Sequence, residues 1–348
     1  MKPWKIDIEN YPLWIDESNQ LLTEWLHHSK YSHIIVLCDT HTRRDCLPLL
    51  PFSDNVNVTV FDAGESHKNL NTVDLIWKDW MQHQLDRKSL VLLLGGGVVG
   101  DMGGFAAATF KRGIDFVHLP TSLMAMTDSS IGGKLGINVH QVKNAAGLFK
   151  NPKAIFINPA FLNTLPLEEI KSGWAEIIKH ALIGSQALFE NIVRQLDSSI
   201  WIPADEILQT SILIKKHFVE RDPFETGIRK ALNFGHTIGH ALESVALACD
   251  KPISHGEAVC RGMVIESKIA VYEGLLNPSA YQQIKNLLEK IYPQIDYTAT
   301  SDDLKYYLKN DKKNEGGRIL FSLITDIGNF IINKEVSILS IDRALSNG

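Results

Sequence analysis

The chain has 348 residues, of which 45% are hydrophobic and 22% are charged, and its formal net charge is −5. This length suits two domains of ordinary size, and the composition is that of a globular protein. It excludes an intrinsically disordered chain, which needs fewer apolar residues and a larger net charge. The acidic balance also argues against a broad nucleic-acid-binding face, so we expect no nucleic-acid partner.

Redox and targeting signals point to the cytoplasm. The four cysteines include no C-x-x-C pair, a pattern that fits a reducing compartment rather than a disulfide framework. The N-terminal segment MKPWKIDIEN is charged and mixed, unlike a secretory signal. The most apolar stretch, residues 90–99, is too short to span a bilayer and contains three glycines. We therefore expect a cytoplasmic protein with no membrane partner.

The first half of the chain alternates apolar runs with a helical pattern. Helical apolar spacing covers residues 70–84, whereas the run at 55–61 alternates at period two, as a strand does. The run at 90–97 is almost continuously apolar, which is typical of a strand buried on both faces. Strands separated by helical segments predict a mostly parallel sheet covered on both faces, an α/β architecture. The predicted strands are residues 33–39, 55–61, 90–97, 116–120 and 154–159.

From about residue 166 the pattern becomes mainly helical. No Gly/Ser-rich linker marks the change. We expect two packed domains, residues 1–165 and 166–348, with ligands bound in the cleft between them. Helices are predicted at residues 168–183, 204–219, 229–248 and 256–274, and a short hairpin strand at residues 319–324.

A glycine-rich turn follows the most apolar strand. Gly95, Gly97 and Gly100 have the spacing G-x-G-x-x-G, which lets backbone N–H groups approach a pyrophosphate at a helix N-terminus. Asp39, at the end of an earlier strand, is a candidate for the ribose hydroxyls of NAD. In the usual fingerprint the acid instead follows the glycines by about 20 residues. Asp101 sits where a phosphate would approach, so it suits substrate contact or solvation of the turn. The alternative is a plain glycine-rich turn of an α/β fold.

A second group of residues has the composition of a metal site. Glu176 and Lys179 lie one helical turn apart, His236 and His240 have i, i+4 spacing, and His255 begins a predicted helix. One carboxylate and two histidines form a common catalytic zinc set, but the sequence does not say which two histidines bind. The metalloprotease pattern H-E-x-x-H is absent, because the residue after His236 is threonine. The alternative is a solvated Glu–Lys pair and ordinary polar histidines.

Polar and cationic residues among small ones suggest an anion pocket. Lysine and arginine from several segments can jointly bind a phosphate and a carboxylate. For a single lysine, a solvated surface position is the alternative, with the glycine-flanked Lys134 as the exception. The candidates are Asp128, Lys134, Asn138, Lys143, Asn144, Lys215, Glu225, Arg229, Asn233 and the pair Lys312–Lys313.

Nine stretches spread over most of the chain form a specific set of motifs. They are GESHK (64–68), GGGVVGDMGGFAAATFKRG (95–113), PTSLMAMTDSSIGGKLGIN (120–138), KNAAGLF (143–149), FLNTLP (161–166), GWAEIIKHALI (173–183), GIRKALNFGHTIGHALE (227–243), HGEAV (255–259) and DKK (311–313). In these motifs the sequence resembles the 3-dehydroquinate synthase family, within the sugar phosphate cyclase superfamily, from about residue 39 to 323. It departs from the family pattern at Asp222–Pro223, where the family usually has Asp-Glu, and in PTSLMAMTDSS, where PTTLLAQVDSS is commoner.

The resemblance implies a Rossmann-like NAD domain with a parallel sheet and a mainly α-helical metal- and substrate-binding domain. It implies a zinc ion, with cobalt as an alternative, on Glu176, His236 and His255. Implied NAD contacts are Asp39, Glu65, Lys68, Gly96, Gly97, Val98, Val99, Gly100, Asp101, Thr121, Ser122, Lys143, Phe161, Leu162, Asn163 and Thr164. Implied catalytic residues are Asp128, Lys134, Lys179, Glu225, Asn233 and His240, and implied substrate contacts are Arg112, Asn144, Lys215, Arg229, Lys312 and Lys313.

The family's reaction converts 3-deoxy-D-arabino-heptulosonate 7-phosphate to 3-dehydroquinate and phosphate, in the shikimate pathway to aromatic amino acids. The resemblance also implies a homodimer, in which Arg112 reaches the neighbouring subunit's site. Other interpretations are another sugar phosphate cyclase making a valiolone or an inosose, a metal-dependent NAD polyol dehydrogenase, or a non-catalytic NAD- or metal-binding regulator. The glycine context of Lys134 and the Asn233 before FGH favour the dehydroquinate enzyme among the cyclases.

Overall fold

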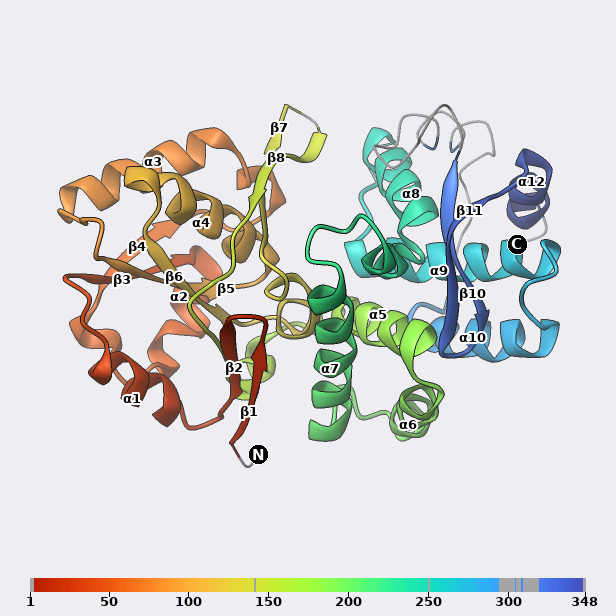
Figure 1. Ribbon diagram of the computed structural model, residues 1–348, viewed down its shortest axis with the longest axis horizontal. Helices are drawn as coiled ribbons and strands as arrows, with labels where there is room; N and C mark the ends of the chain where they lie inside the picture. The colour runs from red at the N-terminus through yellow and green to blue at the C-terminus, as the bar shows by residue number, and fades with distance from the viewer. Residues whose placement is uncertain are drawn as a thin grey trace. The chain divides into compact units, whose positions relative to one another are not determined.

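The computed structural model describes residues 3–140, 142–249, 251–293, 304, 308 and 319–346. By its contacts the chain divides into two compact units, residues 1–170 and 171–348, which we describe separately (Figure 1). The division of NAD binding and metal binding between residues 1–165 and 166–348 stays a prediction. None of the described helices combines the length and the apolar character needed to cross a membrane.

The first unit is built on a seven-stranded sheet with strand order β1-β2-β9-β6-β5-β3-β4. Every neighbouring pair is parallel except β1 and β2, which form an antiparallel hairpin at one edge. The parallel sheet predicted from the apolar runs is confirmed, whereas the edge hairpin was not predicted. The strands are β1 (Trp4–Ile8), β2 (Tyr11–Ile15), β3 (Ile34–Asp39), β4 (Asn57–Phe61), β5 (Leu90–Gly95), β6 (Asp115–Pro120) and β9 (Ile155–Ile157).

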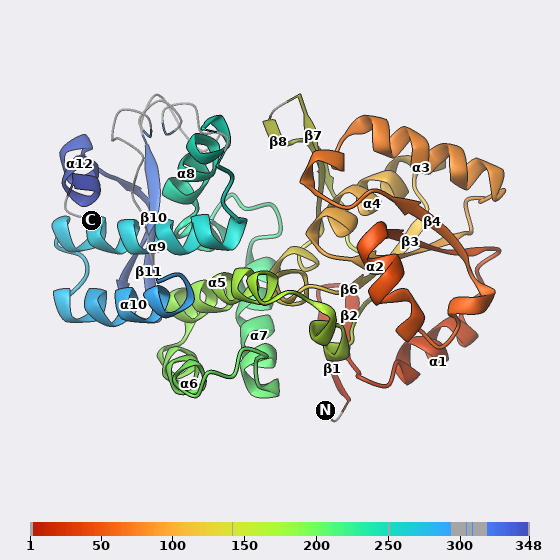
Figure 2. The same cartoon turned by 180° about the vertical axis from the view of Figure 1, so that it is seen from behind.

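Helices cover this sheet, and a second hairpin lies beside it (Figures 1 and 2). The α-helices are α1 (Gln20–His28), α2 (Thr40–Asp45), α3 (Leu70–Gln82) and α4 (Gly97–Thr109). The hairpin is β7 (Lys134–Val139) with β8 (Val142–Phe149). Short turns are the 3₁₀ segments η1 (Leu47–Leu49), η2 (Ser53–Asn55), η3 (Glu65–His67), η4 (Phe110–Arg112) and η6 (Pro159–Thr164), and the π turn η5 (Ala125–Ser129).

The helix α4 lies close against both the sheet and the β7–β8 hairpin. A Cβ added at Gly103 would come within 2.6 Å of the Leu37 side chain, and one added at Gly104 within 2.3 Å of Leu135. Met102 and Ala106 of the same helix are fully buried in a core shared with α3 and β5. The small residues after the glycine-rich turn therefore fix where α4 starts relative to the carboxyl ends of the strands.

His118 of β6 makes the folded first unit sensitive to acid. It is a buried side chain, and a Cβ added at Gly100 would lie 3.4 Å from its ring. Burial lowers the pKa of His118 to about 4, because the charged imidazole loses its hydration. Between this pKa and the unfolded value near 6.5 the unfolded state binds more protons, so stability falls as the pH drops through that window.

We expect His118→Gln to remove this acid-dependent loss, which reaches about 3 kcal/mol near pH 4. Urea unfolding of both proteins at pH 7, 6 and 5 measures it: the wild-type free energy of unfolding should fall faster than that of the variant. Parallel pH profiles in the two proteins would contradict the assignment.

The second unit is mainly helical and carries one antiparallel hairpin among its described residues. Its helices are α5 (Leu167–Gly184), which begins just before the division, α6 (Gln186–Asp197), α7 (Asp205–Arg221), α8 (His236–Ala248), α9 (His255–Tyr272), α10 (Pro278–Ile291) and α12 (Ile338–Ser346), with the 3₁₀ segment η7 (Ile228–Asn233). The hairpin is β10 (Leu320–Asp326) with β11 (Asn329–Glu335), so the strand predicted at 319–324 is confirmed.

One predicted helix is wrong in its extent. Residues 229–248 do not form one helix, because the backbone ends η7 at Asn233 and starts α8 at His236. Gly235, between them, has φ +81°, a left-handed conformation that interrupts a right-handed helix. The break makes His236 the first residue of α8 rather than a residue in mid-helix.

Candidate active site

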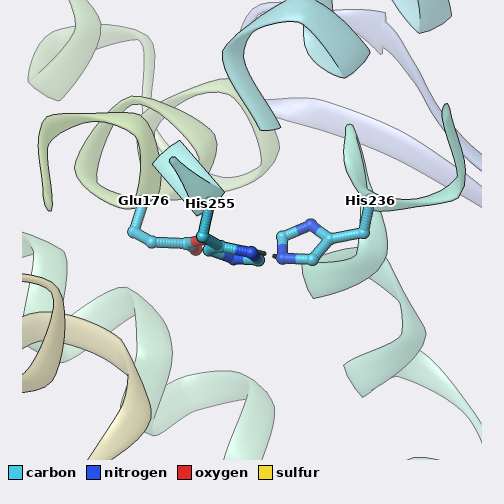
Figure 3. A group of neighbouring side chains, drawn as sticks. All are labelled: Glu176, His236 and His255. Carbon is cyan, nitrogen blue, oxygen red and sulfur yellow. Dashed lines mark ion pairs between the residues drawn. The ribbon is translucent and has the colours of Figure 1, made fainter. Parts of the chain in front are cut away.

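Three side chains of the second unit converge, one from each of three helices (Figure 3). His236 Nε2 lies 3.5 Å and His255 Nε2 lies 3.6 Å from the same carboxylate oxygen, Glu176 Oε1. One potential ligand atom from each residue lies within 4.8 Å of the other two. The three residues that the family resemblance implies as metal ligands thus lie together, with Glu176 in the middle of α5 and the histidines at the starts of α8 and α9.

The donor set fits a catalytic zinc ion. A carboxylate oxygen and two imidazole nitrogens are the protein ligands of a common catalytic type, which leaves a position open for substrate or water. Glu176 is almost fully buried, so its charge needs nearby cations. Cobalt(II) takes the same kinds of ligand.

His240 and Glu243 lie beside this cluster. The ring of His240 is 5.3 Å from that of His236 and 6.1 Å from that of His255, between centroids. Glu243 Oε2 lies 3.8 Å from His255 Nδ1, so His255 has a carboxylate near each of its two ring nitrogens. His240, Glu243 and His255 also form a second group whose donor atoms are close enough to hold a metal.

The electrostatics of the cluster favour positive charge. Burial alone would lower the pKa of His255, but Glu176 and then Glu243 more than offset this and raise it to about 9. Lys179, one turn along α5, forms an ion pair with the other oxygen of Glu176, and both side chains are buried. A metal that binds here therefore has to displace a proton from His255.

A tight loop after α7 holds the polar residues that precede α8. The carboxylate of Asp222 accepts hydrogen bonds from the backbone N–H groups of Thr226 (3.0 Å), Gly227 (2.7 Å) and Arg229 (3.0 Å). Burial opposes ionisation of Asp222, but these bonds lower the pKa of its carboxyl group. Pro223 keeps its carbonyl, which accepts from Arg229 Nη1 at 2.5 Å. The departure from the family pattern at Pro223 thus leaves Arg229 held in place.

The same loop presents a bonded pair of predicted catalytic residues. Glu225 has φ +59° and accepts a hydrogen bond from Asn233 Nδ2 at 2.6 Å. Arg229 is fully buried, and Lys215 of α7 is almost so. Among the predicted substrate contacts, Lys312 and Lys313 lie outside the described residues.

In the first unit the glycine-rich turn joins β5 directly to α4. Gly96 precedes the first helical residue and has extended φ/ψ. Ser122 lies next to it, since a Cβ added at Gly96 would be 3.3 Å from Ser122 Oγ. Thr121 N donates to Gly95 O at 3.0 Å. The predicted NAD residues of the turn and of 121–122 therefore share one edge of the sheet, where ligands of doubly wound folds bind.

A polar network lies behind this turn and ties three segments together. Lys68 Nζ donates to Asp101 Oδ2 at 2.6 Å and to Asn144 Oδ1 at 2.7 Å. Asn138 Nδ2 donates to Glu65 Oε1 at 2.9 Å, and Asn144 N donates to Asn138 Oδ1 at 2.9 Å. Burial raises the pKa of Asp101, and Lys68 opposes that rise. The sequence pointed to these residues separately but could not show that one lysine connects them.

Other predicted cofactor residues differ in what they present. Asp39 accepts from the Thr42 backbone N–H at 2.7 Å and so caps α2 at the carboxyl end of β3. Val99, Phe161 and Leu162 are fully buried and shape the core, whereas Asn163 is exposed. Val98 is part-buried in the first turn of α4, and Lys143 is exposed on β8. Thr164 Oγ1 donates to Phe161 O at 2.7 Å.

Three further predicted residues of the first unit lie in turns or at a strand end. Arg112 is exposed in a loop where Lys111, Arg112 and Gly113 all have positive φ. Asp128 lies in the π turn η5 and is half-buried. Lys134 is exposed at the first position of β7. Left-handed conformations at two successive non-glycine residues are strained, and strained backbone of this kind is common in functional loops.

Solved structures share this two-unit fold. Over 98% of the chain it is similar to 2-epi-5-epi-valiolone synthase from Streptomyces hygroscopicus, solved with NAD⁺ and Zn²⁺, with TM-score 0.87, 26% identity and 97% of that chain covered. A glycerol dehydrogenase from Schizosaccharomyces pombe shares the fold at TM-score 0.66 and 15% identity, covering 96% of this chain and 87% of that one. The fold and the clustered Glu, His and His side chains define the class that includes the sugar phosphate cyclases.

Sequence comparison narrows this class. The family model for the N-terminal part of 3-dehydroquinate synthase matches residues 58–172, and that for the C-terminal part matches residues 173–314. A 3-dehydroquinate synthase from Parabacteroides distasonis is 40% identical over 91% of both chains. One from Crocosphaera subtropica is 44% identical over 82% of this chain and 80% of its own. The chain belongs to the 3-dehydroquinate synthase family.

Proposed function

We propose that the chain is an enzyme that converts 3-deoxy-D-arabino-heptulosonate 7-phosphate to 3-dehydroquinate and phosphate, a step of aromatic amino acid biosynthesis. The observation that carries this proposal is the meeting of Glu176, His236 and His255, in a chain 40% identical over 91% of its length to a 3-dehydroquinate synthase. A carbon–oxygen lyase acting on a sugar phosphate needs charge stabilisation at the reacting hydroxyls, and this cluster provides a place for it.

The cofactors of this proposal are NAD and zinc, which the related valiolone synthase structure carries. Glu176, His236 and His255 would hold the metal, which when bound acts as a Lewis acid on substrate hydroxyls. NAD bound in the first unit would supply a reversible hydride acceptor and would not be consumed. In the first unit the turn at Gly96–Asp101 would receive the pyrophosphate at the start of α4. Lys68 holds Asp101 and Asn144 in place there.

The proposed reaction is a transient oxidation at C5, loss of phosphate by β-elimination, reduction, opening of the sugar ring and an intramolecular aldol closure. We assign Lys134 and Asn144 to the substrate phosphate, joined by a lysine of the Lys312–Lys313 pair. Lys215 and Arg229 are assigned to the C1 carboxylate, for which a guanidinium fork is well suited. Their burial supports this, because desolvated cations bind a carboxylate more strongly than exposed ones do.

His240 and Asn233 are assigned to proton transfer and substrate orientation. Glu225 accepts from the Asn233 amide and so fixes which way that side chain points. Lys179 and Asp128 complete the predicted catalytic set. Much of the rate enhancement in such a site comes from holding one substrate conformation in reacting geometry.

The test supplies purified protein with Zn²⁺, a catalytic amount of NAD and the heptulosonate phosphate, and follows phosphate and 3-dehydroquinate together. We expect equal release of both, with no net formation of NADH. No phosphate release from folded, metal-loaded protein would contradict the proposal. Turnover of sedoheptulose 7-phosphate or glucose 6-phosphate instead would indicate another cyclase, and stoichiometric NADH from polyols would indicate a dehydrogenase.

We place the enzyme in the cytoplasm. All four cysteines are free thiols, three of them buried, as is usual in a reducing compartment.

We also propose a homodimer in which Arg112 contributes to the neighbouring subunit's substrate site. The side chain of Arg112 is exposed and its backbone is strained, which supports a role in contacts outside its own subunit. Arg112→Ala is expected to lose activity by at least about tenfold, the size of one lost charge-assisted contact. Mixing it with a His236→Ala protein should restore activity, because one site of each mixed dimer is then complete. Absence of rescue in dimers shown to be mixed would contradict a shared site.

A further inference from the structure

The start of α8 carries two residues of the proposed site but lacks a cap of its own. His236 is its first residue, and His240 follows one turn later. The residue before the helix is Gly235, which has no side chain to accept from the first-turn N–H groups. Unsatisfied N–H groups at a buried helix start are costly, so an acceptor has to come from elsewhere.

That acceptor is Glu266 of α9. Its Oε2 accepts from the backbone N–H of Gly235 at 2.6 Å, and its Oε1 accepts from that of Ile238 at 2.9 Å. Glu266 is fully buried. A carboxylate at a helix N-terminus is favoured by the helix dipole, and its hydrogen bonds are of the strong, charge-assisted kind.

The two helices that Glu266 joins carry the two histidines of the cluster. His255 is the first residue of α9, and His236 is the first of α8. The helices meet backbone to backbone, since a Cβ added at Gly262 would lie 1.9 Å from Gly235 O and one added at Gly239 would lie 2.9 Å from Ala258 O. Glycine contacts permit this closeness but provide no directional bonds, whereas Glu266 does.

We propose that Glu266 is a positioning residue that sets His236 against His255 by clamping the first turn of α8 to α9. The inference rests on the proposed metal-binding role of those histidines. Without the carboxylate, two buried N–H groups lose their acceptor and the first turn of α8 can rotate or fray. A metal site tolerates displacements of only about 0.5 Å before its affinity falls.

The experiment compares Glu266→Ala and Glu266→Gln with the wild type, using Co²⁺ as the probe. Chelator competition gives the Co²⁺ dissociation constant, and the visible absorption of bound Co²⁺ reports its ligand geometry. We expect Glu266→Ala to weaken Co²⁺ binding by about 10- to 100-fold and to change the spectrum, as loss of a supporting residue does at other sites. Glu266→Gln keeps one acceptor oxygen, so its Co²⁺ dissociation constant should lie between those of the wild type and Glu266→Ala.

Ile284→Ala is the matched control, because it removes buried volume from α10, a neighbour of α9, and leaves the start of α8 untouched. This variant should have a lower melting temperature, but its Co²⁺ affinity and absorption spectrum should equal those of the wild type. Glu266→Gln is the gentler variant, and it decides the test if the alanine variant does not fold. If Glu266→Gln also lowers only the melting temperature, the positioning role is overturned.

A wild-type protein that binds Co²⁺ no better than a His236→Ala variant would instead overturn the proposed metal site, and the role of Glu266 with it. If His236→Ala binds Co²⁺ more weakly than the wild type while Glu266→Ala binds it equally well, only the positioning role of Glu266 is refuted. The two failures are therefore distinguishable from the same set of titrations.

Discussion

Replacing His236 with alanine is expected to abolish stoichiometric zinc binding and to lower turnover by about 10³-fold or more. The variant leaves one imidazole and one carboxylate, too few for a catalytic zinc site. Removal of a Lewis acid costs several kcal/mol of transition-state stabilisation, and each 1.36 kcal/mol is a factor of ten in rate. Zinc content per chain and phosphate release by the same preparation measure the two effects.

His217→Ala is the control for this experiment. His217 is exposed on α7, in the same unit as the cluster but outside it, so its loss should leave zinc content and rate unchanged. His236→Ala protein with wild-type zinc content and activity would rule out His236 as a ligand. The group His240, Glu243 and His255 would then be the next candidate to examine.

The layered fold could be predicted because its strands are strongly apolar. The run at β5 is buried along its whole length, as the interior of a parallel sheet requires. The β1 edge strand was missed although Trp4–Ile8 alternate between apolar and polar residues, because an alternation of only five residues is easily overlooked beside the longer apolar runs. The break before α8 was missed because helical spacing continues across Gly235, although a glycine at that point is a sign that the helix begins afterwards.

From residue types and spacing alone the site could be predicted only as a group of candidates, and the family resemblance was needed to choose Glu176, His236 and His255 among them. Glu176, His236 and His255 come from three helices, and no local spacing relates Glu176 to the histidines. Lys68 likewise meets Asn144 across 76 residues of sequence. Glu266 was not identified, because a glutamate within an apolar helix carries no signal of its partner. The signal that existed was indirect: an uncapped helix start at Gly235 implies an acceptor from another element.

The fold by itself does not decide the reaction. Cyclases and a glycerol dehydrogenase share it, the latter at 15% identity. In the proposed function the buried cations Lys215 and Arg229 bind the substrate carboxylate, a group that a simple polyol lacks. This is why the first assay offers the heptulosonate phosphate and not a simple alcohol.

Lys179→Met should destabilise the metal-free protein by about 3 kcal/mol, since Lys179 and Glu176 form an ion pair in which both side chains are buried. The value is at the low end for a broken buried pair, because His255 remains beside Glu176 with its pKa raised to about 9. Zn²⁺ should restore much of the loss by supplying the missing positive charge. Addition of zinc should therefore stabilise the variant more than it stabilises the wild type.

Urea unfolding with EDTA and with Zn²⁺ measures both quantities for each protein. The double variant Glu176→Gln/Lys179→Met is the control, because it removes the buried charge together with its partner. Without zinc it should be more stable than Lys179→Met alone, since a neutral amide costs less to bury than an unpaired carboxylate. Zinc should then give it little stabilisation, because one metal ligand is lost. Equal destabilisation of Lys179→Met with and without zinc would show that Lys179 does not balance the charge of the Glu176 carboxylate.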